Sequence, residues 1–230
     1  ELYLKKGYDR DTATVYAMIE IMDEGIGELL GELDRLKLSK KTIVIFASDN
    51  GPDPLVSPRF NSELRGTKYT VYEGGIHVPL MIRWPAQLAA SERDEVIHFA
   101  DILPTLMELC QLEIPARLKL DGTSLAGLLR QQQPVEHALP QQRFWQWNRK
   151  EPLHSHNAAV REGDWKLVRP YVTRNIPKSE SKQQPALYRL SSDPTESHDV
   201  SAQHPERTAR MNEALEAWSQ EVERDRQRVP

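Results

Sequence analysis

The sequence has 230 residues, enough for one large domain or two small ones. Its 30 Lys and Arg against 34 Asp and Glu leave a formal net charge of -4 without a basic block, which argues against a nucleic-acid partner. No apolar run approaches the roughly 18 residues that a membrane-spanning helix needs, and the single cysteine excludes an intrachain disulfide framework and a thiolate zinc cluster.

The first predicted element is a long helix that either Asp9 or Asp11 can cap. Its apolar residues recur with the i, i+3, i+4, i+7 spacing, which predicts a helix that packs by one stripe. That stripe consists of Val15, Met18, Ile19, Met22, Ile26, Leu29, Leu30 and Leu33. After a break at residues 37–41, the apolar run Ile43–Ala47 predicts a strand buried on both faces, as a parallel strand of an α/β sheet is.

Two oxygen-bearing side chains, Asp49 and Asn50, follow directly after this strand. Ligands of open α/β sheets bind beyond the carboxyl ends of the strands. Carboxylate and amide oxygens suit a hard cation such as Ca²⁺. Asn50-Gly51 by itself indicates a plain turn, but the buried strand before it and the lysine-bearing loop after it favour a metal-binding pair.

A basic loop comes next, with Arg65 and Lys68 at positions where an oxyanion could bind. A cation site beside an anion site indicates hydrolysis of a sulfate or phosphate ester. For Arg65 two alternatives are equal, because an arginine beside a glycine can also brace the loop. In the segment that begins at Glu73, we interpret Gly74 and Gly75 as allowing close approach of the backbone to the metal loop, and Glu73 as structural.

The later elements change character at about residue 115. Ile76–Trp84 predicts a second strand and Asp101–Leu112 a helix with Pro104 in its first turn, where proline is tolerated. Beyond them, strands are predicted at Phe144–Asn148, Ala158–Val168 and Leu187–Leu190, with loops at 131–134 and 175–185. A terminal helix from Pro205 carries Met211, Leu215, Trp218 and Val222 on one face, so the chain is expected to end in a small antiparallel sheet covered by a helix.

Three motifs carry a family resemblance: S-D-N-G at 48–51, L-R-G-x-K at 64–68 and Y-E-G-G at 72–75. With Trp84-Pro85 and the A-V-R-E-G-D-W-K-L segment at 159–167, the chain closely resembles the sulfatases over nearly its whole length. The resemblance implies an α/β, alkaline-phosphatase-like fold with a small α+β C-terminal domain. Residues 1–118 would be the second half of the catalytic domain, and residues 119–230 the C-terminal subdomain.

The resemblance also implies an activity, sulfuric ester hydrolysis, and roles for site residues. Asp49 and Asn50 would be two of the four side chains that hold the family's Ca²⁺, and Lys68 would contact the substrate sulfate as the catalytic cation, with Arg65 as a second substrate contact. His77 stands where the family often has arginine, so a substrate contact there is not expected. The substrate would be a small sulfate ester or a sulfated glycan, and the family suggests an exported enzyme.

One departure limits what the chain is expected to do alone. The family's nucleophile is a formylglycine made from cysteine in C-x-[PA]-x-R, whereas Cys110 is followed by Gln111-Leu112-Glu113. We therefore expect a C-terminal part of a sulfatase that is inactive by itself and associates through exposed apolar surface. The alternatives are a phosphate or phosphonate ester hydrolase of the same superfamily, or a non-catalytic fragment.

A histidine pair and three tryptophans could also bind a ligand, but a structural or solvated role is favoured for each. His154-x-His156 could suggest a metal site, but without a third ligand histidines in a loop are usually solvated, and a substrate-contacting rim is the lesser alternative. Trp145, Trp147 and Trp165 could stack on sugar, but their alternating strand positions favour the core.

Overall fold

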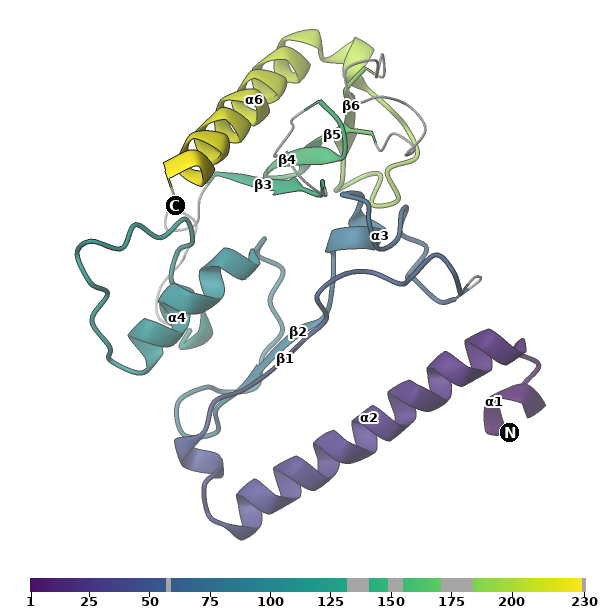
Figure 1. Cartoon of the computed structure of the whole chain (residues 1–230), viewed down its shortest axis with the longest axis vertical. Helices are drawn as coiled ribbons and strands as arrows, with labels where there is room; N and C mark the ends of the chain where they lie inside the picture. The colour runs from purple at the N-terminus through teal and green to yellow at the C-terminus, as the bar shows by residue number, and fades with distance from the viewer. Residues whose placement is uncertain (57–58, 132–140, 149–154, 171–183, 229–230) are drawn as a thin grey trace.

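The computed structural model describes residues 1–56, 59–131, 141–148, 155–170 and 184–228, and Figure 1 shows its layout. The N-terminal helices are α1 (Leu2–Lys5) and α2 (Arg10–Arg35). Asp9 caps α2, since its carboxylate accepts hydrogen bonds from the backbone N–H groups of Asp11 and Thr12 at 2.9 and 3.0 Å. Of the two caps that the sequence allowed, the structure selects Asp9.

The apolar stripe of α2 is not packed, contrary to the prediction. Met18, Met22 and Leu29 are 63%, 46% and 57% exposed, and the buried residues of this helix are Thr12 and Ala13 at its start. Figure 1 shows α2 running along one side of the molecule, away from the C-terminal sheet. The periodicity correctly indicated a helix, but no residue of its stripe is buried in the part of the chain that the structure describes.

The predicted strand 43–47 forms as β1 (Val44–Ala47), after the short helix η1 (Ser39–Lys41). Its partner is β2 (Leu80–Arg83), and the two pair antiparallel, with Ala47 opposite Leu80 and Val44 opposite Arg83. The prediction of a parallel strand buried on both faces is therefore wrong for the described part of the chain. The chain turns back after β1, and residues 48–79 bring β2 alongside in the opposite direction.

The next helices lie beside this ribbon. The chain enters helix α3 (Glu73–Ile76) before β2, so the predicted strand 76–84 is shorter than expected. After β2 come η2 (Phe99–Asp101), α4 (Ile102–Leu109) and α5 (Ala126–Leu129). Pro104 lies in the first turn of α4 as predicted, and Cys110 is its exposed C-cap.

The buried carboxylate of Asp101 connects this helical region to the C-terminal sheet. It accepts hydrogen bonds from the backbone of His98 and Thr123 and from the guanidinium of Arg143, each at 2.8 Å. The pair between Asp101 and Arg143 is almost fully shielded from solvent, with side chains 0% and 6% exposed. A buried ion pair of this kind fixes geometry more than it adds stability.

The C-terminal sheet contains β3 (Gln142–Gln146), β4 (Ala158–Glu162), β5 (Trp165–Arg169) and β6 (Ala186–Arg189) in the antiparallel order β3-β4-β5-β6. The single strand predicted at 158–168 is therefore two strands, which reverse at Gly163 with a φ of 56°. A positive φ suits glycine, which explains the turn.

The last helices, η4 (Ser201–Gln203) and α6 (Pro205–Arg228), follow β6, and α6 covers one face of the sheet (Figure 1). Met211 and Leu215 are fully buried against a cluster from the three strands β4, β5 and β6, as predicted for this helix face. Trp218 stacks on Phe144 with ring centroids 5.1 Å apart. Apolar burial of this kind provides most of the stability of such a layer.

The opposite face of the sheet packs on the segment just before α3. Its cluster contains Val71, Tyr72, Ala159, Val168, Ala186, Tyr188 and Leu190, with Trp145 and Trp147 partly buried against it. Trp165 packs against the α6 side. All three tryptophans thus support the core, as predicted. Among the described residues, no helix is long and apolar enough to cross a membrane.

Candidate functional site

Asp49 and Asn50 form a tight turn immediately after β1. The side-chain amide of Asn50 donates a hydrogen bond to Asp49 Oδ1 at 2.8 Å, and the Ser48 hydroxyl donates to the carbonyl oxygen of Asn50 at 2.8 Å. The Asp49 residue is exposed, and Asn50 is half-buried. Two hard oxygen donors are therefore held side by side at the end of a strand.

The glycines place this turn against α3. Gly51 N donates a hydrogen bond to Gly75 O at 3.0 Å. A Cβ atom added to Gly51 would lie only 1.8 Å from Gly74 O, and one added to Gly75 would lie 2.2 Å from Thr70 O. Only glycine fits at position 51, so the turn after β1 lies directly against the backbone of α3. Gly75 is crowded instead by Thr70 of the lysine loop, and the role of the turn as a metal loop stays a prediction.

Lys68 lies on the loop that packs beside this turn. Its backbone N–H donates a hydrogen bond to Pro52 O at 2.9 Å, two residues after Asn50. Its ammonium lies 3.8 Å from Asp53 Oδ2 and 5.4 Å from the centre of the Tyr69 ring, with the side chain 35% exposed. The structure thus places Lys68 against the residues that follow the Asp49-Asn50 turn, and the joint role of these residues in one site stays a prediction.

Arg65 points toward the C-terminal sheet. Its guanidinium donates hydrogen bonds to the Tyr188 hydroxyl at 3.0 Å and to Glu196 O at 2.7 Å. It also lies 4.1 Å from the centre of the Tyr72 ring, a cation–π distance. These contacts favour the loop-bracing alternative, and a contact of Arg65 with the substrate anion stays a prediction.

Glu73 is the centre of a buried ionic network. Its carboxylate lies 2.7 Å from Lys166 Nζ, 3.3 Å from His77 Nδ1 and 3.7 Å from the guanidinium of Arg161. Lys166 also lies 2.9 Å from Glu196 Oε1, and the backbone N–H of Glu73 donates to Glu196 Oε2 at 2.6 Å. This network joins α3 to the C-terminal sheet, in agreement with a structural role for Glu73.

The network shifts the pKa of each acid in a different direction. Burial alone would raise the pKa of Glu73, but the hydrogen bond with His77 and the charge of Lys166 bring it down to about 2. The same hydrogen bond raises the pKa of His77. Burial raises the pKa of Glu196, and Lys166 opposes that rise only in part.

The side-chain oxygens at this turn are of the type that binds Ca²⁺, but they are too few to complete a Ca²⁺ site. Asp49 and Asn50 provide carboxylate and amide oxygens, yet Ca²⁺ takes 6–8 oxygen ligands. Within the described ranges, no group of three or more His, Cys, Asp or Glu side chains could hold a metal ion. His154 lies outside those ranges. His156 is buried and 3.0 Å from the Ser155 hydroxyl, so the prediction of a solvated histidine is wrong for it.

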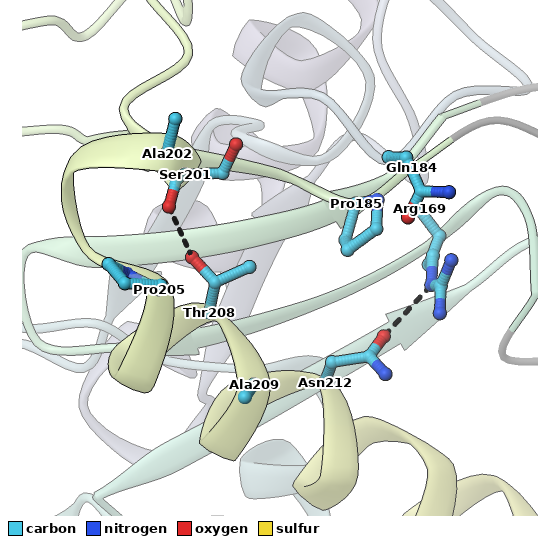
Figure 2. Close-up of a pocket in the computed structure, with 9 residues that line it drawn as sticks. All are labelled: Arg169, Gln184, Pro185, Ser201, Ala202, Pro205, Thr208, Ala209 and Asn212. Carbon is cyan, nitrogen blue, oxygen red and sulfur yellow. Dashed lines mark hydrogen bonds between the residues drawn. The ribbon is translucent and has the colours of Figure 1, made fainter.

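A cavity of about 420 Å³ lies elsewhere, between β5, the start of β6 and the start of α6 (Figure 2). Two hydrogen bonds join residues of this lining: Arg169 donates to Asn212 at 2.9 Å, and the Thr208 hydroxyl donates to Ser201 O at 3.3 Å. Asp49, Asn50, Arg65 and Lys68 are not among its lining residues.

Sequence reasoning missed Lys166, Glu196 and Asn157, which connect the site loops to the C-terminal sheet. Lys166 is completely buried. The available signal was strand alternation, since Lys166 shares a sheet face with the buried Val168. Asn157 donates hydrogen bonds to Tyr69 O and Trp147 O, and no sequence signal indicated these contacts.

Comparison with known proteins identifies the family of the chain. The family model described as Sulfatase matches residues 3–112, and the model described as N-sulphoglucosamine sulphohydrolase, C-terminal, matches residues 67–223. The chain belongs to the sulfatase family. The two matches overlap over the lysine loop and α3, and the division at residue 118 stays a prediction.

Individual sulfatases resemble this one over most of its length. N-acetylgalactosamine-6-O-sulfatase of Bacteroides thetaiotaomicron is 31% identical in an alignment 213 residues long, which covers 85% of this chain and 40% of that protein. Arylsulfatase K of Mus musculus is 31% identical over 88% of this chain and 34% of its own. A solved structure of Ps i-CgsB in complex with k-i-k-neocarrahexaose has a TM-score of 0.74 and 25% identity, covering 92% of this chain and 44% of that one. The chain thus spans less than half the length of these relatives.

Proposed function

We propose that this sulfatase chain contributes the Ca²⁺ half-site and the sulfate-binding lysine of a sulfuric ester hydrolase. The observation that carries the proposal is that backbone hydrogen bonds join the turn after β1 to the segment that contains Lys68 and α3. The Lys68 backbone bonds to Pro52 O and the Gly51 backbone to Gly75 O, so the turn with the metal ligands and the loop with the cation form one surface.

Each residue has a separate task in this proposal. Asp49 and Asn50 hold Ca²⁺, which when bound polarises sulfate oxygens as a Lewis acid. Lys68 presents its ammonium to the same oxygens and stabilises the charge that they gain during transfer. Arg65 keeps the loop against Tyr188 and Glu196, so that Lys68 stays in place.

The nucleophile belongs to sequence outside these 230 residues in this proposal. Cys110, the only cysteine, is the C-cap of α4 and is followed by residues that do not match the formylglycine motif. Attack on sulfur needs an activated nucleophile. The chain alone is therefore expected to be inert and to bind Ca²⁺ no more tightly than about the millimolar range of weak sites.

The substrate class is a sulfate ester, either a small molecule or a sulfated glycan. The printed names of two relatives support a glycan, since one is an N-acetylgalactosamine-6-O-sulfatase and another was solved with a neocarrahexaose. Export from the cell is part of the same proposal. The exposed apolar residues of α2 support association through that helix.

The test is hydrolysis of an aryl sulfate and an aryl phosphate by a polypeptide that contains both this chain and a complete nucleophile motif. Sulfate turnover should exceed phosphate turnover and should require Ca²⁺. Asp49→Ala should abolish the Ca²⁺-dependent turnover, whereas Asp23→Ala on the exposed surface of α2 should not. An active Asp49→Ala enzyme, or faster phosphate turnover, would reject the proposal.

The isolated chain provides a second test. It should show no aryl sulfate turnover, and calorimetry should detect at most weak Ca²⁺ binding. Turnover that survives Cys110→Ala would reveal a nucleophile within the chain and contradict the assignment.

A further inference from the structure

Asn157 lies between the C-terminal sheet and the lysine loop. It directly precedes β4 and is 1% exposed. Its side-chain amide donates two hydrogen bonds, to Tyr69 O at 2.7 Å and to Trp147 O at 2.8 Å. A single nitrogen therefore connects the residue after Lys68 to the residue that follows β3.

The sheet holds Asn157 rigidly on both sides. Its carbonyl accepts a hydrogen bond from Trp147 N at 2.9 Å, and its N–H donates to Pro170 O at 3.2 Å. These bonds extend the ladders of β4 with β3 and with β5 by one residue each. The amide is thus presented from the end of β4, an inner strand of the four-stranded sheet, which is a stiff support for a functional loop.

The loop that receives this hydrogen bond is strained. Tyr69 has a φ of 80°, a value that is rare for a bulky residue, and Asn157 itself has a φ of 48°. Strained backbone persists where the surroundings impose it, and it occurs often at functional sites. The ring of Tyr69 also packs on that of Trp147, with centroids 5.1 Å apart.

The amide of Asn157 is not fully satisfied. Its Oδ1 atom is buried and has no hydrogen-bond partner among the described residues. A buried acceptor without a partner is costly and needs an explanation in a native structure. The two hydrogen bonds that Asn157 Nδ2 donates to backbone carbonyls offset the cost of leaving Oδ1 without a partner.

We propose that Asn157 is a positioning residue that fixes Lys68 by holding the carbonyl of Tyr69. Lys68 is then anchored on both sides: its own N–H bonds to Pro52 O, and the next carbonyl bonds to Asn157. The C-terminal sheet thereby sets the place of the sulfate-binding ammonium relative to the metal turn. This inference rests on the proposed function of Lys68.

The experiment is a double-mutant cycle on the sulfatase that contains the complete site. Asn157→Asp keeps the side-chain shape and tolerates positive φ but replaces the donor with an oxygen. It should lower kcat for an aryl sulfate about 10- to 100-fold, the range for residues that orient a site group. In a Lys68→Ala background the same change should alter kcat less than about twofold, because the group that it positions is gone.

Two further variants separate positioning from stability. Asn157→Gly also removes the amide and suits the left-handed backbone, so it replaces the Asp variant if that variant fails to fold. Asn148→Asp is the matched control: the amide of Asn148 donates to His156 O at 3.4 Å, and kcat should stay unchanged.

The outcomes distinguish this inference from the proposed function. An equal loss of kcat in both backgrounds, or a lower melting temperature with normal kcat, would overturn the positioning role alone. Normal turnover of Lys68→Ala would overturn the proposed function, and this inference with it.

Discussion

The ammonium of Lys166 lies 2.7 Å from a carboxylate oxygen of Glu73, across 93 residues of sequence, and both side chains are almost fully buried. Lys166 belongs to β5 in the C-terminal sheet, and Glu73 begins α3 beside the lysine loop. Glu196 lies 2.9 Å from the same ammonium, so Lys166 pairs with two buried carboxylates, while Arg161 and His77 also lie beside Glu73. The site loops therefore depend on the C-terminal sheet for their charge balance.

Replacing Lys166 with methionine should destabilise the chain strongly. Methionine leaves Glu73 and Glu196 buried without their main cation, and breaking a buried pair typically costs about 3–5 kcal/mol. Arg210→Met is the matched control, because Arg210 pairs with Glu162 at 2.6 Å but is 52% exposed, where ion pairs contribute about 0–1 kcal/mol. Urea unfolding measures both variants. If both variants lost a similar free energy of unfolding, the buried pairs of Lys166 would contribute no more than an exposed ion pair.

The same network predicts a loss of stability in acid. The pKa of Glu73 falls from an ordinary 4.5 to about 2, so this group stabilises the fold above pH 4.5 and loses that contribution as the pH falls from 4.5 toward 2. The pKa of Glu196 is raised, so its contribution to stability has the opposite pH dependence: it is full below pH 4.5 and decreases as the pH rises above 4.5. Urea unfolding between pH 2 and pH 6 should show the loss, and Glu73→Gln should flatten it. A Glu73→Gln variant with the wild-type slope would contradict the assignment.

His77 should contribute with the opposite sign. Its pKa is raised by the hydrogen bond to Glu73, so protonated His77 stabilises the fold fully below about pH 6.5, and the contribution is lost as the pH rises through the folded-state pKa. The unfolding free energies of wild type and His77→Gln should therefore differ at pH 6 and converge at higher pH. His198→Gln, an exposed histidine 3.9 Å from Asp193, serves as the comparison. A difference for His77→Gln that stays constant between pH 6 and pH 9 would exclude this titration.

Sequence patterns predicted the helix cap, the apolar helix face and the turn well, because each of these is determined by residues close together in the sequence. The cap at Asp9, the stripe of α6 and the turn after β1 each depend on neighbouring residues. The motif spacing also located the lysine loop. The direction of β1 was wrong, since a short, wholly apolar strand has the same pattern in a parallel or an antiparallel pair.

Long-range partners could not be read from the sequence. A lysine is almost never fully buried unless paired, and the partner of Lys166 lies 93 residues away. The bond from Asn157 to Tyr69 O spans 88 residues and depends on positive φ values at both positions. Such contacts arise only when the sheet packs on the loop.

The glycine contact predicts opposite effects for two similar substitutions. Gly51→Ala would place a Cβ atom 1.8 Å from Gly74 O, so the backbone must move, at a cost of about 1–3 kcal/mol or more. Gly25→Ala in α2 meets nothing within 4 Å, and it should stabilise the helix by about 0.5–1 kcal/mol. Urea unfolding of both variants checks the prediction. A neutral Gly51→Ala would show that the turn does not press against α3.

Lys68→Ala should separate catalysis from stability. The side chain is 35% exposed and its nearest carboxylate, that of Asp53, lies 3.8 Å away, so its removal should change the unfolding free energy by no more than about 0.5 kcal/mol. Loss of a preorganised charge at the transferring group should lower kcat by roughly 10²–10³. Aryl sulfate turnover and the thermal midpoint, measured on the sulfatase with the complete site, give the two values.

Lys41→Ala is the control for Lys68→Ala, because Lys41 is an exposed lysine on η1, before β1. It should change neither value. Lys68→Arg sharpens the test, since a planar guanidinium does not reproduce a compact ammonium and should restore only part of the turnover. A large fall in the thermal midpoint of Lys68→Ala with normal turnover would reverse the assignment, because it would make Lys68 a structural partner of Asp53 and not the group that binds sulfate.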